Sequence, residues 1–206
     1  MVDSALSDHA NQLIANCASE LLEASQSVEG WDDLGVTNDV RSYRRMTDNG
    51  IYLVRGEGII NVPAQRILDL LLDADRKKEW DEMYLEGYIV AEIAPGTRIL
   101  YNRFSAPWPV YERDFVFVVK HQDIDGKIVY AGKSVEVPSI PPKDGAVRGE
   151  VHASGFIFEP ISENSTRVIY FVNVDPKGSI PTMVVNFMSS KQTQNIHRIR
   201  TLLESS

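Results

Sequence analysis

Apolar side chains recur at helical spacing close to the start of the chain. The positions that share one face of the predicted helix are Ala10, Leu13, Ile14, Cys17 and Leu21. Because residues three or four apart lie on the same side of an α-helix, the pattern predicts one amphipathic helix over about residues 4–25. The short Gly- and Asp-containing stretch around Trp31 and Leu34 is predicted as a connection.

The pattern then changes to that of a β-hairpin. Residues 40–46 and 51–60 are predicted as two strands, and Asp48-Asn49-Gly50 lies between them. Asn-Gly is a strong hairpin signal because both residues tolerate the positive φ of a tight turn. Gly56 and Gly58 inside the second strand indicate a bend, or an element that packs closely on the backbone.

Helices return after Pro63, and strands fill most of the rest. A stripe of Ile67, Leu68 and Leu71 predicts a helix that ends near residue 75, followed by a shorter helix over 76–84. Turn signals then separate strands predicted at 86–93, 97–104, 114–121, 127–136, 147–159 and 166–174. A final helix is predicted over about residues 181–203.

This order predicts an α+β fold with an antiparallel sheet, because the short links leave no room for βαβ crossovers. A bent sheet has a concave apolar face, and the helix at 181–203 is the element left to cover it. Residues 189–195 of that helix are wholly polar. Two interpretations stay open: the polar residues line a partly hollow interior, or they face water on a frayed turn.

Composition narrows the classes of function. The 206 residues carry a formal net charge of −8, which argues against a nucleic-acid binder. A single cysteine, Cys17, excludes an internal disulfide framework and a thiolate zinc cluster. The first residues lack the pattern of a signal peptide, and no apolar run approaches the roughly 20 residues of a transmembrane helix. We therefore expect a single cytoplasmic domain spanning residues 1–206.

Four segments of the sequence resemble the START domain, a lipid-transfer domain related to the steroidogenic acute regulatory protein. They follow the order and spacing of that family, and the resemblance extends over about residues 5–204. The segments are residues 71–81 (LLDADRKKEWD), 107–116 (PWPVYERDFV), 145–149 (GAVRG) and 175–181 (DPKGSIP). The run 71–81 and the Pro-aromatic-Pro loop look most similar to the phosphatidylcholine-transfer branch.

The resemblance implies a helix-grip fold: a curved nine-stranded sheet closed by the C-terminal helix over a tunnel for one lipid. The strands predicted above are one short of nine, and we expect the missing strand near Arg41–Arg45. Where the phosphatidylcholine-transfer branch has a Tyr and an Arg for the headgroup, this chain has Leu71 and Lys77. Where sterol-binding members carry a buried Glu and Arg, it has Leu100 and Val119, so the identity of the lipid does not carry over.

The candidate lipid-binding residues come from the two helical segments and the strands between them. Asp81 is placed at the tunnel as a partner for a polar headgroup, or alternatively as a backbone cap, and Lys77 either meets a phosphate or is solvated. The expected lining residues are Leu71, Lys77, Asp81, Phe104, Phe156, Met183, Val184, Phe187 and Met188. Of the four on the last helix, two are expected to line the cavity.

Two arginines on predicted strands are further candidates. If its strand face points inward, Arg103 or Arg148 supplies the buried cation that a phosphate needs. A buried Arg without a carboxylate or anionic ligand would be costly. The alternative for each is an outward, solvated salt bridge.

The Pro-aromatic-Pro loop is the candidate gate or membrane contact. Trp108, Val110 and Tyr111 lie in a rigid loop, and Trp and Tyr suit the membrane interface because each joins an apolar body to a polar tip. The alternative is that Trp108 is a plug beneath the sheet. By the resemblance, this loop packs beside the C-terminal helix near residues 183–188 and opens for lipid entry.

The predicted function is non-catalytic binding and transfer of one lipid, expected to be a phospholipid. The four histidines show no metal-ligand spacing, and no nucleophile elbow or phosphate-binding glycine loop is present, so no catalytic residue, metal or cofactor is assigned. The expected partners are a lipid and, transiently, a membrane, with the protein as a monomer. Two alternatives stay open: a lipid-sensing module, and an enzyme built on the helix-grip scaffold.

Overall fold

A curved sheet of eleven strands forms the body of the protein in this computed structural model, which describes residues 4–178, 180, 184, 188 and 191–205. The strands are β1 Asp32–Thr37, β2 Val40–Met46, β3 Tyr52–Ile60, β4 Tyr84–Ala94, β5 Thr97–Phe104, β6 Glu112–Ile124, β7 Lys127–Ser134, β8 Ala146–Arg148, β9 Glu150–Val151, β10 Ser154–Ser162 and β11 Ser165–Asp175. Their main spatial order is β1-β2-β3-β11-β10-β7-β6-β5-β4, in antiparallel pairs. Of the two short strands, β8 pairs with β6 in parallel and β9 pairs with β11.

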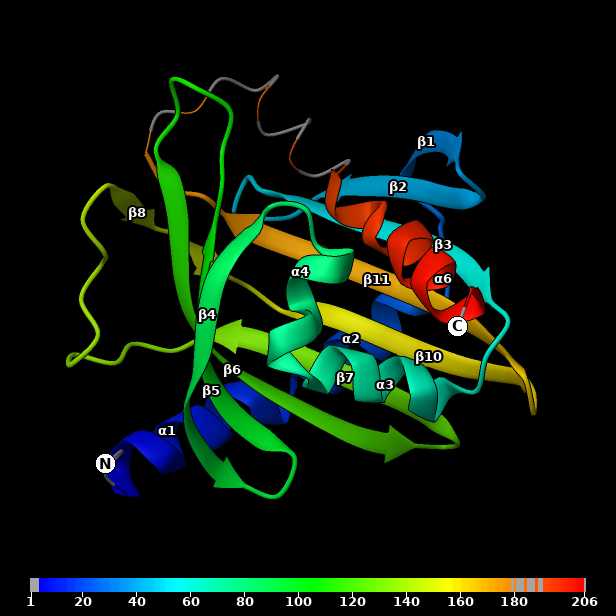
Figure 1. The fold of residues 1–206 in the computed structure, drawn as a ribbon, viewed down its shortest axis with the longest axis horizontal. Helices are drawn as coiled ribbons and strands as arrows, with labels where there is room; N and C mark the ends of the chain where they lie inside the picture. Colours follow the sequence, from blue (N-terminus) through cyan, green and yellow to red (C-terminus); the bar gives the residue numbers. More distant parts are fainter. Residues whose placement is uncertain (1–3, 179, 181–183, 185–187, 189–190, 206) are drawn as a thin grey trace.

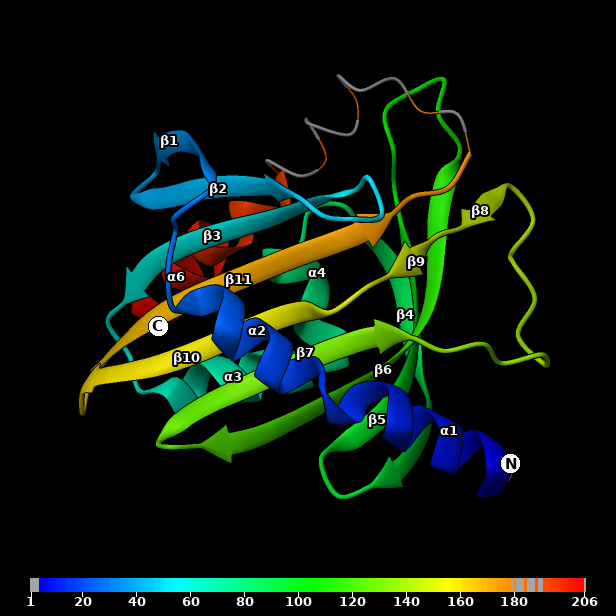
Figure 2. The ribbon, with the colours of Figure 1, turned by 180° about the vertical axis from the view of Figure 1, so that it is seen from behind.

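Helices cover both faces of this sheet, as the two opposite views show (Figures 1 and 2). The helices α1 Ser4–Ala15 and α2 Cys17–Ser25 pack on the face seen in Figure 2. The opposite face carries α3 Ala64–Leu72, a 3-10 turn Ala74–Arg76, α4 Lys77–Trp80 and α6 Asn195–Glu204. Because successive strand residues point to opposite faces, Ile157 joins the first apolar cluster and Phe158 joins the second.

The α+β class and the helix-grip arrangement predicted from the sequence are confirmed. The structure differs from the predicted elements in three places. The expected first helix is interrupted at Asn16, and the strand predicted over 147–159 is divided into β8, β9 and β10. The strand missing from the prediction is β1, in the stretch interpreted as a connection, and not Arg41–Arg45, which lies within β2.

The glycines of β3 allow α6 to lie close to the sheet, as the sequence indicated. A Cβ atom at Gly56 would come within 3.0 Å of Thr193 Cβ. At Gly58 it would come within 3.0 Å of Ile196 Cγ2 and 2.8 Å of an Arg200 nitrogen. A larger residue in place of Gly56 or Gly58 would therefore push α6 outward.

Side chains of α6 fix this helix firmly to the sheet. Ile196 and Ile199 are fully buried, and Leu203 is nearly so. Arg200 donates to the carbonyls of Asn38, Asp39 and Ile59, and the carboxylate of Glu204 accepts from the Asn61 amide. The described part of the predicted helix at 181–203 thus ends in a well-anchored segment.

The polar stretch before α6 faces the protein where the structure describes it. Thr193 and Asn195 are buried, and Thr193 shares a 3.1 Å hydrogen bond with Ser42. The side chain of Gln194 accepts a hydrogen bond from Asn38 and donates to the Thr37 carbonyl. The described residues of the polar stretch are therefore not a frayed turn in water, but among them Gln192 alone lines the interior cavity, whereas Lys191, Thr193 and Gln194 line an outer groove.

Candidate functional site

An apolar cavity of about 180 Å³ lies between the concave face of the sheet and the helices that cover it. The wall includes Leu71 and residues of α4, the first part of β6, the start of β10 and the end of β11. The predicted residues that line it are Leu71, Lys77, Asp81, Phe104, Phe156 and Met188. Of the other residues predicted on the last helix, Val184 is half-buried and is not part of the wall, and Met183 and Phe187 lie outside the described residues.

Lys77 and Asp81 are the two charged side chains in the described part of this wall, and together they form what we call its polar pole. The Nζ of Lys77 lies 5.2 Å from the ring centre of Tyr84, 5.5 Å from that of Phe104 and 5.6 Å from that of Trp80. When the side-chain amide of Asn102 is oriented with its oxygen toward Lys77, Nζ donates a 2.9 Å hydrogen bond to that oxygen. Burial lowers the pKa of Lys77, and the attraction of Asp81 partly opposes that shift. The ammonium group therefore points inward, contrary to the solvated alternative.

Asp81 forms the other half of the polar pole. The residue is only 3% exposed, and burial raises the pKa of its carboxyl group despite the nearby charges of Lys77 and Arg198. The carboxylate accepts from the Met83 amide at 3.2 Å and from Gln192. Asp81 is thus both a backbone cap and a cavity residue, so the two interpretations offered for it hold together.

Aromatic rings make up the wall beside the pole. Phe156 stacks on Tyr170 with 3.9 Å between ring centres, and Trp80 meets Phe156 edge-on. The hydroxyl of Tyr170 donates to Gln192 at 3.0 Å. Within the described part of the chain the indole N–H of Trp80 has no hydrogen-bond partner, although the residue is only 4% exposed. A buried donor without an acceptor is costly, so a ligand oxygen at this place would be stabilised.

Several lining residues were not singled out from the sequence. Phe115, Phe117 and Val119 alternate along β6 and all reach the cavity, as do Tyr170 and Val172 on β11. Their two-residue alternation was the available signal, but the sequence does not say which face of the strand is concave. Val119, one of the two apolar residues at the sterol-type positions, is part of the wall, and Leu100 lies beside a smaller hollow next to it.

Arg103 and Arg148 do not line the cavity, and the proposal that either meets a ligand phosphate there is corrected. Arg103 pairs with Glu86 and Glu112. Arg148 donates to the fully buried Asp114 at 2.9 Å and 3.1 Å and to the carbonyl of Ile140. The division of the predicted strand 147–159 explains the second error, since Arg148 lies in β8, opposite Asp114 of β6.

The loop between β5 and β6 exposes its aromatic residues. Trp108 is 93% exposed and Tyr111 is 69% exposed, while Val110 is half-buried. Trp108 is therefore not a plug beneath the sheet. Its expected packing against residues 183–188 lies almost entirely outside the described residues.

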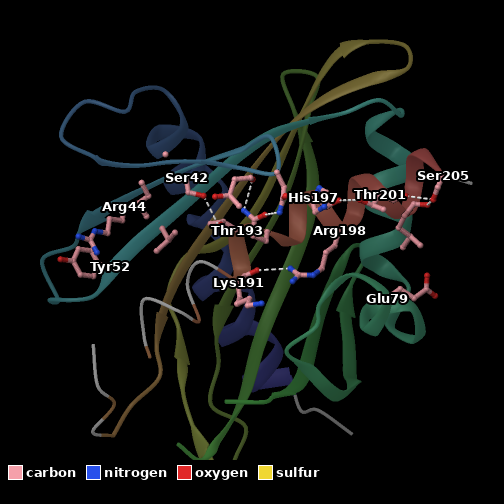
Figure 3. A pocket seen from close by; sticks show the side chains of 17 residues that line it. Ser42, Arg44, Tyr52, Glu79, Lys191, Thr193, His197, Arg198, Thr201 and Ser205 are labelled. Atoms are coloured by element: carbon pink, nitrogen blue, oxygen red, sulfur yellow. Dashed lines mark hydrogen bonds between the residues drawn. The ribbon is translucent and has the colours of Figure 1, made fainter. Parts of the chain in front are cut away.

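A second hollow, a groove of about 900 Å³, lies on the other side of the terminal helix, between α6 and the strands β1 to β3 (Figure 3). It is lined by polar and charged side chains, including Arg44, Lys191 and Arg198. These cations already have acidic partners, because Arg44 pairs with Asp32 and both Lys191 and Arg198 pair with Glu82. The groove is therefore a weaker candidate for a ligand than the apolar cavity.

Among the residues that the structure describes, no group of three or more His, Cys, Asp and Glu side chains is arranged to hold a metal ion. None of the described helices combines the length and the apolar character needed to cross a bilayer.

A curved antiparallel sheet, closed by helices over an apolar cavity with one polar pole, defines a ligand-binding protein of the helix-grip class. The chain belongs to the START domain family, whose model matches residues 12–201. The resemblance in the four sequence segments is thus confirmed.

Individual relatives agree with this assignment. The chain is 25% identical over 199 residues to the phosphatidylcholine transfer protein of Rattus norvegicus, covering 88% of this chain and 92% of that protein. It is 27% identical over 142 residues to START domain-containing protein 10 of Mus musculus, covering 67% of this chain. There the match spans about half the relative's length, 49%. The structure of human StAR-related lipid transfer protein 5 superposes with a TM-score of 0.88 at 26% identity, covering 97% of this chain and 98% of that one.

Proposed function

We propose that residues 1–206 form a lipid-binding domain that carries one lipid in its cavity and transfers it between membranes without catalysis. The observation that carries this proposal is the cavity under the helices, whose wall is mostly aromatic and aliphatic and has its charged side chains at the Lys77–Asp81 pole. Such a wall binds long apolar chains through the hydrophobic effect and orients one polar end. Relatives named for lipid transfer support the same function.

The polar pole favours a lipid whose headgroup has no net charge. Lys77 and Asp81 are the charged side chains among the described lining residues, and their charges balance. A headgroup with a net charge would leave one buried charge without a counterion, which is costly. A zwitterionic phospholipid fits this balance, with its phosphate toward Lys77 and the Trp80 indole N–H and its cationic group toward Asp81.

Loading and release require the walls of the cavity to separate. A volume of about 180 Å³ is smaller than the roughly 300–1,000 Å³ of most ligand pockets. We place the membrane contact at Trp108 and Tyr111, which are exposed beside the cavity. With a formal net charge of −8, the contact depends on apolar insertion and not on attraction to anionic lipids. The protein acts as a cytoplasmic monomer in this proposal.

Native mass spectrometry of the purified protein, followed by lipid extraction, tests the proposal. We expect one lipid per chain. The substitution Val172→Phe fills the cavity and is expected to abolish the bound mass, while Val36→Phe, on the exposed strand β1, is expected to leave it unchanged. Recovery of the protein without lipid, together with failure to move labelled phosphatidylcholine between phosphatidylcholine vesicles, would overturn the proposed function.

A further inference from the structure

Arg113, at the start of β6, is buried with only main-chain partners. It is 3% exposed, and its guanidinium group donates to three carbonyl oxygens: those of Tyr111, Pro176 at 2.7 Å and Lys177 at 3.1 Å. No carboxylate is paired with it among the described residues. Since an arginine buried without a counterion is expensive, all three carbonyls are needed to keep this side chain in place.

The three carbonyls belong to two segments that are far apart in the sequence. Tyr111 ends the exposed loop that carries Trp108, and Pro176 and Lys177 form the turn after β11. Pro176 also lines the cavity. One side chain therefore connects a wall of the cavity to the loop that presents the exposed aromatic residues.

Each of the two segments is held together by its own bonds. In the loop, the Val110 amide donates to the Pro107 carbonyl at 2.9 Å. In the turn, the Lys177 amide donates to Asp175, and the Lys177 ammonium pairs with both Asp175 and Glu150 at 2.7 Å. Within the described part of the chain, the guanidinium group of Arg113 makes the hydrogen bonds that join the loop to the turn.

We propose that Arg113 is a positioning residue for lipid exchange, which makes the loop at 107–111 and the turn at 175–178 open together. A bilayer that pulls on Trp108 then strains the carbonyl bonds of Arg113 and moves Pro176 away from the cavity. The role of Arg113 in lipid exchange rests on the proposed function. The coupled opening of the two segments does not, and it is tested below without any lipid.

Limited proteolysis measures the opening of the two segments separately. Chymotrypsin cleaves after Tyr111 and trypsin cleaves after Lys177, and each cleavage rate follows the local opening of its segment. In Arg113→Met we expect both rates to rise by about tenfold, with trypsin cleavage after Lys127, at the start of β7 and opposite the far end of β6, unchanged. Arg113→Lys is expected to behave like Arg113→Met, because one ammonium group does not reach three carbonyls. The matched control Arg167→Met removes a cation that pairs with Glu57 and Glu159, outside both segments, and both rates should stay at the wild-type value.

Coupling is tested by disturbing one segment and measuring the other. Glu150→Gln removes one ion pair of Lys177 and loosens the turn, so we expect cleavage after Tyr111, in the other segment, to rise by about threefold. In the Arg113→Met background the same substitution should have no further effect on Tyr111. If Glu150→Gln leaves Tyr111 unaffected in the wild-type background, or if Arg113→Met releases only one segment, the proposal is overturned. Either result can be obtained whether or not the protein carries lipid.

Discussion

The two ends of the cavity cover are held by different kinds of interaction. At one end, α6 buries Ile196, Ile199 and Leu203 against the sheet and lies directly on the glycines of β3. At the other end, the loop at 107–111 and the turn at 175–178 are joined through hydrogen bonds to Arg113, beside an exposed Trp108. Apolar packing resists any local separation, whereas hydrogen bonds can be exchanged for bonds to water at a small net cost. The comparison assigns stability to the first end and motion to the second.

The largest effect is expected from shortening a side chain beneath α6. Ile199→Ala should lower the free energy of unfolding by about 2–5 kcal/mol, because it leaves a cavity in a fully buried position. Ile161→Ala, at a position 56% exposed, is the matched control and should stay within about 0.5 kcal/mol of wild type. Urea denaturation of both variants makes the measurement. Equal losses would show that α6 is not the anchored end.

A smaller loss is expected from crowding the same contact. Gly58→Val should cost about 1–3 kcal/mol, since its first added carbon already meets Ile196 at 3.0 Å. Gly58→Ala adds only one carbon atom, so its loss of stability should be smaller than that of Gly58→Val. Thermal melting of the two variants measures the order. If valine is tolerated as well as alanine, the close approach of α6 is not a constraint.

The polar pole, between the two ends, should make stability depend on pH. Burial raises the pKa of Asp81 above the value of about 3.9 expected in the unfolded chain, so the fold prefers the neutral carboxyl group. The stability that Asp81 contributes is therefore present below about pH 4 and is lost as the pH rises through its raised pKa. Relative to Asp81→Asn, wild type should lose about 1.4 kcal/mol for each unit of that shift.

Unfolding curves of wild type and Asp81→Asn at pH 4 and pH 7 check this dependence. A difference between the two proteins that stays constant over this range would mean that the carboxyl group is ionised at an ordinary pKa. The pole would then not be buried in the way that the contacts of Asp81 indicate.

The smallest effect on stability, but a clear effect on transfer, is expected at the exposed loop. Trp108→Ala should change the free energy of unfolding by less than about 0.5 kcal/mol, because the side chain is 93% exposed. Lipid transfer between vesicles should slow several-fold, since a membrane anchor is lost. A melting curve beside a transfer assay separates the two quantities. A loss of about 3–5 kcal/mol would instead identify a buried tryptophan.

The sequence predicted the class of fold, because hydrophobic period and turn residues are local signals. The hairpin at Asp48-Asn49-Gly50 and the close packing over Gly56 and Gly58 are examples. Strand β1 escaped because Asp32, Asp33 and Gly35 disfavour strands and all of its residues are exposed. Its pairing with β2 depends on the tertiary structure, which no local sequence pattern encodes.

The candidate site was predicted less completely. The sequence leaves open whether Lys77 is solvated or meets a phosphate, and only the fold shows that its ammonium group faces three aromatic rings. For Arg103 and Arg148 the structure shows salt bridges, the second of the two alternatives, and the sequence could not decide between them because the direction of a strand side chain depends on register. Arg113 received no role at all, since its partners are backbone oxygens, and every residue in a sequence has one.

That last feature has a consequence for how the loop could be altered by design. A side chain that recognises only main-chain oxygen atoms is indifferent to the identity of the residues that supply them. The exposed positions of the loop, Trp108 and Tyr111, can therefore be replaced to suit membranes of other composition while the connection through Arg113 is kept. The residues that contact the membrane and the hydrogen bonds of Arg113 behind them can therefore be changed independently of each other.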